Sequence, residues 1–397
     1  MSKKWLTVVV LSLFLLKVFS ISLTDFDLFG DEAQYWLWSK DLNFGYFSKP
    51  PLLAWLISVY SELFGDSFFS LKLLPILLYF CTALAVYDLS KNIGLDINNA
   101  VCCSLIFLII PGVSFSTFII STDVLLLLFW TLSLNELIKI KNKQDTKSFL
   151  VLGVFLGLAF LSKYAAVYFV ICLFIYIIID NSFRRFFIKN YLGFLLSFVC
   201  AFVILFPNLI WNFKNGWVTL QHTSDNANFN NINISFFRGV EFLLFQTLMV
   251  GPFLFLGAMI NLKNINFDKS QKILLVFSMP IFVIVSIEAV IVRANANWAA
   301  PALISFYLFL YITLKNGFIK KIKILFNFVF CFVFFLLVGL SYQSSIFNRI
   351  NGINEYAKNI LYNDLQGKIS HLVVSDRLLY ASLSYQLRDE DVTFLMP

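Results

Sequence analysis

Apolar residues fill long runs of this chain, and short polar segments separate the runs. Each run is close to the roughly 20 residues that a helix needs to cross a bilayer. The pattern predicts about eleven transmembrane helices, near residues 5–23, 68–88, 100–115, 121–139, 148–162, 164–179, 191–210, 239–260, 273–292, 300–314 and 324–342. It therefore indicates an all-α polytopic membrane protein.

The composition agrees with this fold class. Of the 397 residues, 59% are hydrophobic and 13% are charged, whereas about a quarter of the residues in a soluble domain are charged. The formal net charge of +7 comes largely from Lys and Arg in short loops between the apolar runs. That distribution is typical of cytoplasmic loops, so we expect membrane lipid and no nucleic acid as a partner.

The order of the loops predicts which side of the membrane each one faces. The first run follows Met-Ser-Lys-Lys, and no small-residue cleavage site comes after it, so we expect a retained helix with a cytoplasmic N-terminus. The basic loops then fall inside, as the positive-inside rule requires. An odd number of helices places the residues after 342 outside.

Two domains follow from this topology. Residues 1–342 form a transmembrane domain whose outer first loop, 24–67, contains a predicted surface helix from Leu52 to Phe64. Residues 343–397 form a small outer α/β segment, with strands at 369–375 and 392–396 and a helix at 377–387. The abrupt ending, Phe394-Leu-Met-Pro397, leads us to expect a truncated segment.

Unusual polar residues gather on the predicted outer face. The window from Gly30 to Leu52 reads GDEAQYWLWSKDLNFGYFSKPPL and ends on a double proline. Asp123 stands at the outer end of the fourth run, and Lys163 stands in the turn between the fifth and sixth. The other polar and aromatic candidates in the outer loops are Asp31, Glu32, Lys49, Trp211, Asn212, Trp217, His222, Arg293, Asn297 and Trp298.

These residue types suit a substrate with a lipid tail and an anionic head. Lysine and arginine can hold phosphate oxygens. Aspartate can act as a general base toward a hydroxyl, or can stabilise positive charge at a sugar carbon. Tryptophan and tyrosine offer flat faces to sugar rings, although they also form the interfacial belt of membrane proteins.

Structural interpretations stay open for the same residues. Asp31, Glu32 and Asp123 can cap helices, while Lys163 and Arg293 can extend toward lipid headgroups. Only one other histidine, the distant His371, accompanies His222 in the sequence, so we do not expect a zinc site built on histidines.

Several motifs in order resemble those of a known family. They are GDEAQYWLWSK with YFSKPPLLAWL, STDVLLLLFW, GLAFLSKYAAV, FPNLIWNFKNGWVTLQH, VEFLLFQTLMVGPFLFL, RANANWAAPAL and, near the end, SDRLLYASLSYQL. The chain resembles the bacterial membrane glycosyltransferases of the GT-C fold that are related to protein O-mannosyltransferases. Within them it is most similar to the branch of aminoarabinose and galacturonic acid transferases that act on lipid A and lipopolysaccharide core.

The resemblance implies an inverting transfer from a polyprenyl (undecaprenyl) phosphate sugar, with the active site on the periplasmic face of the bacterial inner membrane. It implies catalytic roles for Asp31, Glu32 and Asp123, and donor phosphate binding by Lys49, Lys163 and Arg293. The substrate-binding residues expected around them are Tyr35, Tyr46, Trp211, Asn212, His222, Asn297 and Trp298.

The chain departs from the aminoarabinose-type relatives at one position that concerns metal binding. Aminoarabinose-type relatives carry a metal-binding glutamate where this chain has Ser48, so the resemblance leaves a divalent metal undecided and requires no other cofactor. Protein mannosyltransferases often have Asp-His before the prolines, where this chain has Ser48-Lys49. We therefore expect a lipid A or lipopolysaccharide acceptor.

Three rival functions differ in what they require of the sequence. A protein O-glycosyltransferase would share the fold and the donor. A transporter or flippase would place ionisable groups at the bilayer midplane and have two related halves, which this chain does not have. A purely structural anchor would need no such polar cluster.

Overall fold

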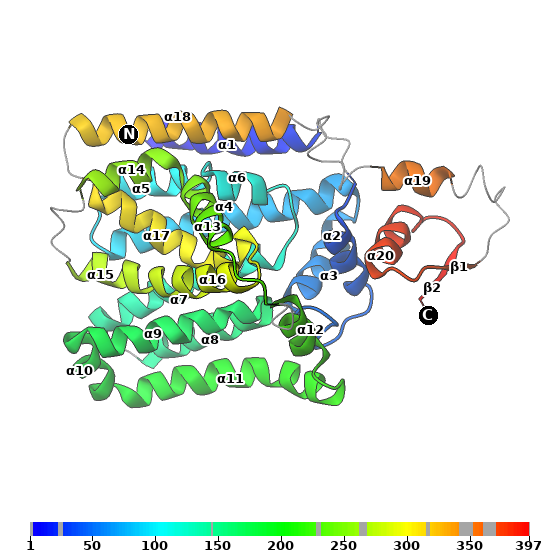
Figure 1. The fold of residues 1–397 in the computed structure, drawn as a ribbon, viewed down its shortest axis with the longest axis horizontal. Helices are drawn as coiled ribbons and strands as arrows, with labels where there is room; N and C mark the ends of the chain where they lie inside the picture. Colours follow the sequence, from blue (N-terminus) through cyan, green and yellow to red (C-terminus); the bar gives the residue numbers. More distant parts are fainter. Residues whose placement is uncertain are drawn as a thin grey trace.

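The computed structural model describes residues 3–22, 27–143, 146–227, 232–261, 268–314, 318–340, 352–359 and 371–396. Long apolar helices run roughly side by side through its main body (Figure 1). The helices that fall in the predicted spans are α1 (Lys3–Ser22), α4 (Phe68–Asn92), α5 (Ile97–Phe107), α6 (Pro111–Ser116), α7 (Thr122–Lys143), α8 (Thr146–Ser162), η1 (Tyr164–Ala166), α9 (Val167–Ile179), α11 (Tyr191–Lys214), α13 (Phe236–Val250), α14 (Pro252–Asn261), α15 (Lys269–Val276), α16 (Met279–Ile291), η3 (Ala296–Ala299), α17 (Ala300–Thr313) and α18 (Phe318–Leu340).

Every predicted apolar run is thus mostly helical where it is described, but short breaks divide several runs into two helices. Among the described residues, four helices are long and apolar enough to cross a membrane, or up to six if each of two bent pairs counts as one span. One bent pair is α13 with α14, which meet at an angle of 102°. The predicted number of eleven transmembrane helices stays a prediction.

The bend between α13 and α14 has a local cause. Gly251 lies between the two helices with φ +107°, a conformation that side chains with a Cβ rarely adopt. Pro252 follows and cannot donate a backbone hydrogen bond. The Asn327 amide oxygen accepts a hydrogen bond from the Leu254 N–H at 3.2 Å, so α18 satisfies a backbone group that the break leaves unpaired.

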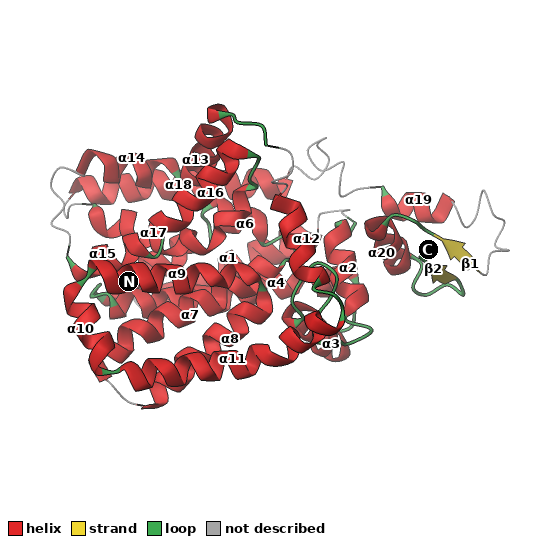
Figure 2. Ribbon diagram, turned by 60° about the horizontal axis from the view of Figure 1, so that its bottom comes forward, coloured by secondary structure: helices red, strands yellow, loops and turns green. Residues whose placement is uncertain are grey.

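Shorter helices and a pair of strands lie at the ends of the bundle (Figure 2). They are α2 (Gly30–Trp38), α3 (Leu52–Phe64), α10 (Asn181–Lys189), α12 (Val218–Ala227), α19 (Ile353–Asn359), β1 (His371–Val373), α20 (Arg377–Gln386) and β2 (Thr393–Leu395). The surface helix predicted from Leu52 to Phe64 coincides with α3.

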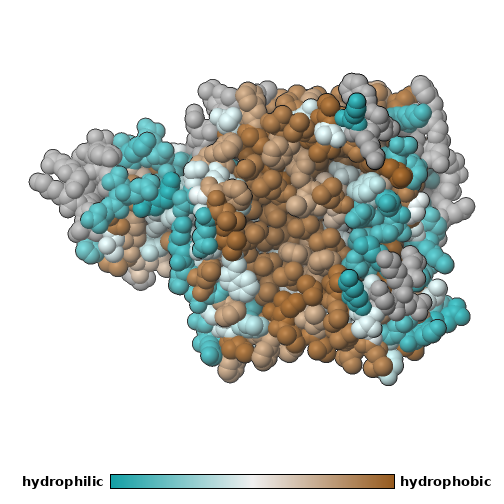
Figure 3. Space-filling view, turned by 180° about the vertical axis from the view of Figure 1, so that it is seen from behind, coloured by the Kyte–Doolittle hydropathy of each residue, from teal (hydrophilic) through white to brown (hydrophobic). Residues whose placement is uncertain are grey.

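The loops separate onto two ends of the bundle. At one end, Lys272 forms an ion pair with Asp180 at 3.3 Å, and the Ser270 hydroxyl donates to the Ile93 carbonyl. These are loops predicted to face the cytoplasm. Elements α2, α3, α12 and α20 lie at the other end (Figure 1). Between the two hydrophilic ends an apolar band crosses the surface (Figure 3), as expected for a protein embedded in a bilayer.

The C-terminal segment has a small βαβ arrangement. Strands β1 and β2 are parallel and pair His371 with Thr393, and α20 connects them. They lie within the regions predicted from sequence; residues 369 and 370 of the predicted first strand fall outside the described residues. Helix α20 packs on α2, where the Tyr385 ring contacts Trp36 at 5.0 Å between centroids.

Candidate active site

Helix α2 carries the first acidic pair, and its two carboxylates face different surroundings. The Glu32 side chain is completely buried, with the Lys72 ammonium 2.6 Å away. Its oxygens also accept hydrogen bonds from the backbone N–H groups of Ile120 and Phe29. These contacts hold α2 against α4 and the loop before α7, and the catalytic role of Glu32 stays a prediction.

Asp31 has the opposite character. Its side chain is half-buried and, among the described residues, makes no hydrogen bond or ion pair. Beneath it, Tyr35 is buried against Trp38. Burial raises the pKa of the Tyr35 hydroxyl, and the charges of Asp31 and Asp123 raise it further. Both carboxylates therefore lie within electrostatic reach of the same ring.

Asp123 joins three elements at the N-terminus of α7. One carboxylate oxygen lies 2.7 Å from the Lys163 ammonium, which stands between α8 and η1. The other accepts a hydrogen bond from the Asn297 amide of η3 at 2.9 Å. Asp123 is only 7% exposed, so its charge needs these partners. The structure thus brings together three of the predicted site residues from distant parts of the sequence.

Lys49 lies in the loop after α2 and is half-buried, with no ion pair to the described residues. Burial lowers the pKa of its ammonium, and the nearby charge of Lys163 lowers it further, while Asp31 and Asp123 oppose the shift. Two lysines and two aspartates therefore form one electrostatic cluster. Two adjacent cations with a free ammonium are suited to an anionic ligand.

Two residues that were predicted to bind substrate, Tyr46 and Trp211, contact the loop between α2 and α3. The Tyr46 hydroxyl donates to backbone carbonyls of Trp38 and Asp41, and the Tyr46 ring stacks on Trp38 at 4.7 Å. The Trp211 ring lies so close to Gly45 that a Cβ there would clash. We infer that Tyr46 and Trp211 shape the loop from within.

Asn212, another predicted substrate-binding residue, is buried in a chain of hydrogen bonds. Its amide donates to the Tyr164 hydroxyl at 2.9 Å, and that hydroxyl donates to Asn208 at 2.7 Å. Asn208 in turn donates to the Phe44 carbonyl at 2.6 Å. This chain of hydrogen bonds fixes the first loop against α11 beside Lys163. Sequence reasoning did not select Asn208 or Tyr164, because hydropathy carries no information about hydrogen-bond partners.

The remaining predicted residues lie at the same end with fewer contacts. His222 on α12 is half-buried, 4.8 Å from the Phe47 ring. Burial lowers the pKa of its imidazole, and the charges of Arg377 and Lys49 add to the effect. Arg293 is exposed and makes no hydrogen bond or ion pair with the described residues, while Trp298 packs on the main core.

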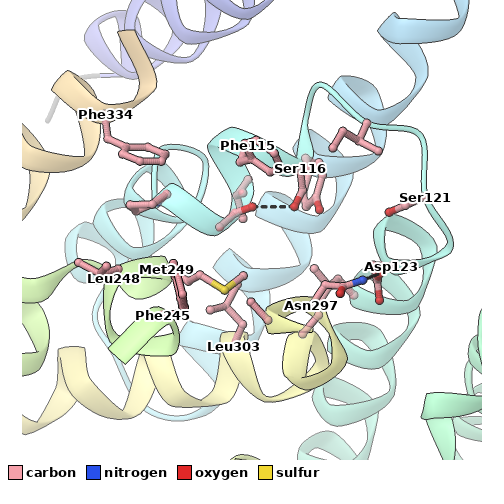
Figure 4. A pocket seen from close by; sticks show the side chains of 18 of the residues that line it. Phe115, Ser116, Ser121, Asp123, Phe245, Leu248, Met249, Asn297, Leu303 and Phe334 are labelled. Carbon is pink, nitrogen blue, oxygen red and sulfur yellow. Dashed lines mark hydrogen bonds between the residues drawn. The ribbon is translucent and has the colours of Figure 1, made fainter. Parts of the chain in front are cut away.

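A cavity of about 690 Å³ opens beside Asp123 and Asn297. Apart from this polar end, its walls are mostly apolar and come from α6, α13, α17 and α18 (Figure 4). Phe115, Phe245 and Leu248 of the wall are exposed apolar side chains. The cavity is therefore suited to an apolar chain that enters from lipid and ends in a polar group.

A protein-bound metal has few candidate ligands here. No group of three or more His, Cys, Asp or Glu side chains in the described ranges could hold an ion. Ser48, where relatives carry a glutamate, is buried.

The chain is similar to known glycosyltransferases. A family model described as dolichyl-phosphate-mannose-protein mannosyltransferase matches residues 48–211. The lipid A galacturonosyltransferase RgtD of Rhizobium johnstonii is 30% identical over 396 residues, covering 96% of this chain and 82% of that protein.

Solved structures share the fold at low identity. ArnT of Cupriavidus metallidurans bound to undecaprenyl phosphate matches with a TM-score of 0.70 at 13% identity, over 99% of this chain and 90% of ArnT. An oligosaccharyltransferase of Archaeoglobus fulgidus tethered with an acceptor peptide matches with a TM-score of 0.61 at 12% identity, over 100% of this chain and 64% of that one. The predicted family resemblance is confirmed: the chain has the fold of ArnT and belongs to the family of membrane glycosyltransferases that includes RgtD.

Proposed function

We propose that this glycosyltransferase moves a sugar from a polyprenyl phosphate donor, of the undecaprenyl type, to lipid A at the periplasmic face of the inner membrane. The observation that carries the proposal is the apolar cavity that ends at Asp123 and Asn297, with Lys163 paired to the same aspartate. It offers a place for an isoprenoid chain and a cation for its phosphate. RgtD, named for lipid A, and ArnT, solved with undecaprenyl phosphate, support the choice of acceptor and donor.

Asp31 is the proposed general base. As the acceptor hydroxyl attacks the sugar carbon, the new C–O bond forms, the bond to the phosphate oxygen breaks, and the hydroxyl proton passes to Asp31. A carboxylate without a protein partner can take that proton. If the acceptor is an ionised phosphate, no proton moves and Asp31 orients the site.

Lysines 49 and 163, with Arg293, would stabilise the departing phosphate. Negative charge accumulates on that group as the sugar leaves, so fixed cations lower the barrier. Asp123 positions the Lys163 ammonium through their 2.7 Å ion pair.

The test is sugar transfer by purified protein in proteoliposomes, with an undecaprenyl phosphate sugar and lipid A. Asp31→Asn should reduce transfer by about a hundredfold or more, the usual effect of losing a general base. Asp41→Asn, a change of the same type on an exposed residue of the same loop, should retain transfer. Full activity of Asp31→Asn would overturn the assigned role. Transfer to a protein and none to lipid A would favour the protein O-glycosyltransferase alternative.

A further inference from the structure

Arg377, the first residue of α20, approaches the candidate site from the C-terminal segment. Its guanidinium lies 5.0 Å from the centre of the Phe47 ring, two residues before Lys49. The next residue, Leu378, is so close to Gly30 that a Cβ there would lie 2.9 Å from the Leu378 Cβ. Arg377 is therefore held beside the turn that begins α2 and carries Asp31.

Within the part of the chain that the structure describes, the guanidinium has no acceptor of its own. Arg377 makes no hydrogen bond or ion pair with the described residues, and its Nη1 nitrogen is enclosed without a partner. An enclosed donor without an acceptor costs about 1–3 kcal/mol. A guanidinium fork in this state is suited to a phosphate or carboxylate, which can accept two hydrogen bonds from it at once.

Arg388, the other arginine of the described C-terminal segment, has a different environment. It donates to the Tyr385 carbonyl at 2.8 Å and stacks on the Tyr385 ring at 4.4 Å. Its Nε lies 3.7 Å from Asp66. Arg388 thus fastens the segment to the first loop. Arg377 has contacts that orient it, and no described residue neutralises its charge.

Lys49 adds a positive charge close to Arg377, and Asp31 lies within electrostatic reach of the same lysine. Lys49 and His222 both experience its charge, and Lys49 also experiences that of Lys163. The apolar cavity described above lies elsewhere. Its polar end is formed by Asp123 and Asn297, and Arg377 does not line it. Lys49 therefore lies within reach of two cations, one beside the cavity and one on the C-terminal segment.

We propose that Arg377 binds an anionic group of the acceptor, a phosphate in the case of lipid A, and holds the acceptor beside Asp31. The unpartnered guanidinium stacked on Phe47 and the contact of Leu378 with Gly30 carry this inference. It deepens the proposed function and rests on it. The C-terminal segment thereby becomes part of the substrate site.

Ligand-induced thermal stabilisation of the full-length protein tests the inference without requiring transfer, because a bound ligand raises the unfolding temperature. The probes are diphosphorylated lipid A, monophosphoryl lipid A and undecaprenyl phosphate, each added separately. The variants are Arg377→Gln, Arg377→Lys and the control Lys358→Gln, which removes an exposed charge from the same segment. Arg377→Lys keeps the charge and removes the fork, and it serves as the test if Arg377→Gln is too unstable to purify.

Arg377→Gln should lose most of the stabilisation by diphosphorylated lipid A and keep that by undecaprenyl phosphate, while Lys358→Gln keeps both. In transfer assays, the KM for lipid A should rise at least about tenfold, as expected for the loss of charge-assisted hydrogen bonds. Loss of the undecaprenyl phosphate effect instead would assign Arg377 to the donor and overturn the acceptor assignment. Unchanged stabilisation by all probes would overturn anion binding by Arg377. A wild type that binds lipid A and transfers no sugar would contradict the proposed function alone.

Discussion

The Lys49 side chain is half-buried and lies near both cations and carboxylates. Its protonation can therefore be followed through the pH dependence of activity. Burial and the charge of Lys163 lower its pKa, against the effect of Asp31 and Asp123. If phosphate binding requires the ammonium, activity is present below the lowered pKa and is lost as the pH rises through it. The loss should therefore come at a lower pH than for an ordinary lysine, whose pKa is about 10.4.

The measurement is the pH profile of kcat/KM for the donor, which reports ionisations of the free enzyme. In Lys49→Arg the guanidinium stays charged throughout the accessible range, so the alkaline decrease should move to higher pH even if the maximum rate falls. Lys40→Arg, on an exposed lysine that pairs with Asp66 at 2.7 Å, is the matched control. An identical alkaline limb in wild type and Lys49→Arg would rule out titration of Lys49 as its cause.

For individual residues, the sequence predicted the end of the molecule at which the polar residues gather. It did not predict which groups each of them contacts. The assignment of sides placed Asp123, Lys163 and Asn297 at one end, and the structure joins them by direct contacts. It could not separate Asp31 from Glu32. Successive residues of a helix point about 100° apart, and the partners of the buried Glu32 carboxylate include Lys72 and Ile120, which are distant in the sequence.

Helices α8 and α11 are in contact along glycines, and this contact supports two parts of the site. A Cβ at Gly153 would lie 2.5 Å from the Ser197 carbonyl oxygen, and the Ser197 hydroxyl donates to the Phe149 carbonyl at 2.7 Å. Small residues allow such close approach between helices in membranes. Lys163 follows the end of α8, and Asn208 on α11 holds the first loop, so the spacing of these helices affects both.

Gly153→Leu should lower stability by about 1–3 kcal/mol or more, because the Ser197 backbone cannot move aside as a flexible side chain could. Thermal unfolding in detergent measures the loss, and transfer should fall with it. Leu150→Ala is the control on the same helix, since the Leu150 side chain is 40% exposed. A smaller loss of stability in Gly153→Leu than in Leu150→Ala would show that the glycine contact is not needed.

Helices were predictable from sequence where an apolar or periodic pattern extended over many residues. All eleven apolar runs are mostly helical where described, and α3 and α20 lie where the sequence placed them. The number of helices that cross the membrane was harder to predict. Hydropathy indicates which residues lie in lipid, but it does not indicate whether a helix continues without a break. The bend at Gly251 depends on a backbone conformation and on an amide from α18, 73 residues away from Leu254.

At the scale of the whole molecule, the separation of loops onto two ends makes a prediction about orientation. Loops predicted to be cytoplasmic meet through Lys272 and Asp180, and the candidate site lies at the opposite end, beyond the apolar band. The positive-inside rule therefore predicts that the site faces the periplasm, where a donor and an acceptor in the outer leaflet could both reach it.

Cysteine labelling in intact cells decides this orientation. Asn43→Cys places an exposed thiol on the first loop, and Ser182→Cys places one on α10 at the other end. A membrane-impermeant maleimide should label Asn43→Cys in cells whose outer membrane has been made permeable, and Ser182→Cys only after the inner membrane is also broken. The unsubstituted protein corrects for its six native cysteines, all of which lie in apolar runs. The reverse pattern would place Asp31 and Lys49 in the cytoplasm, and a donor and acceptor presented in the periplasm could not then be its substrates.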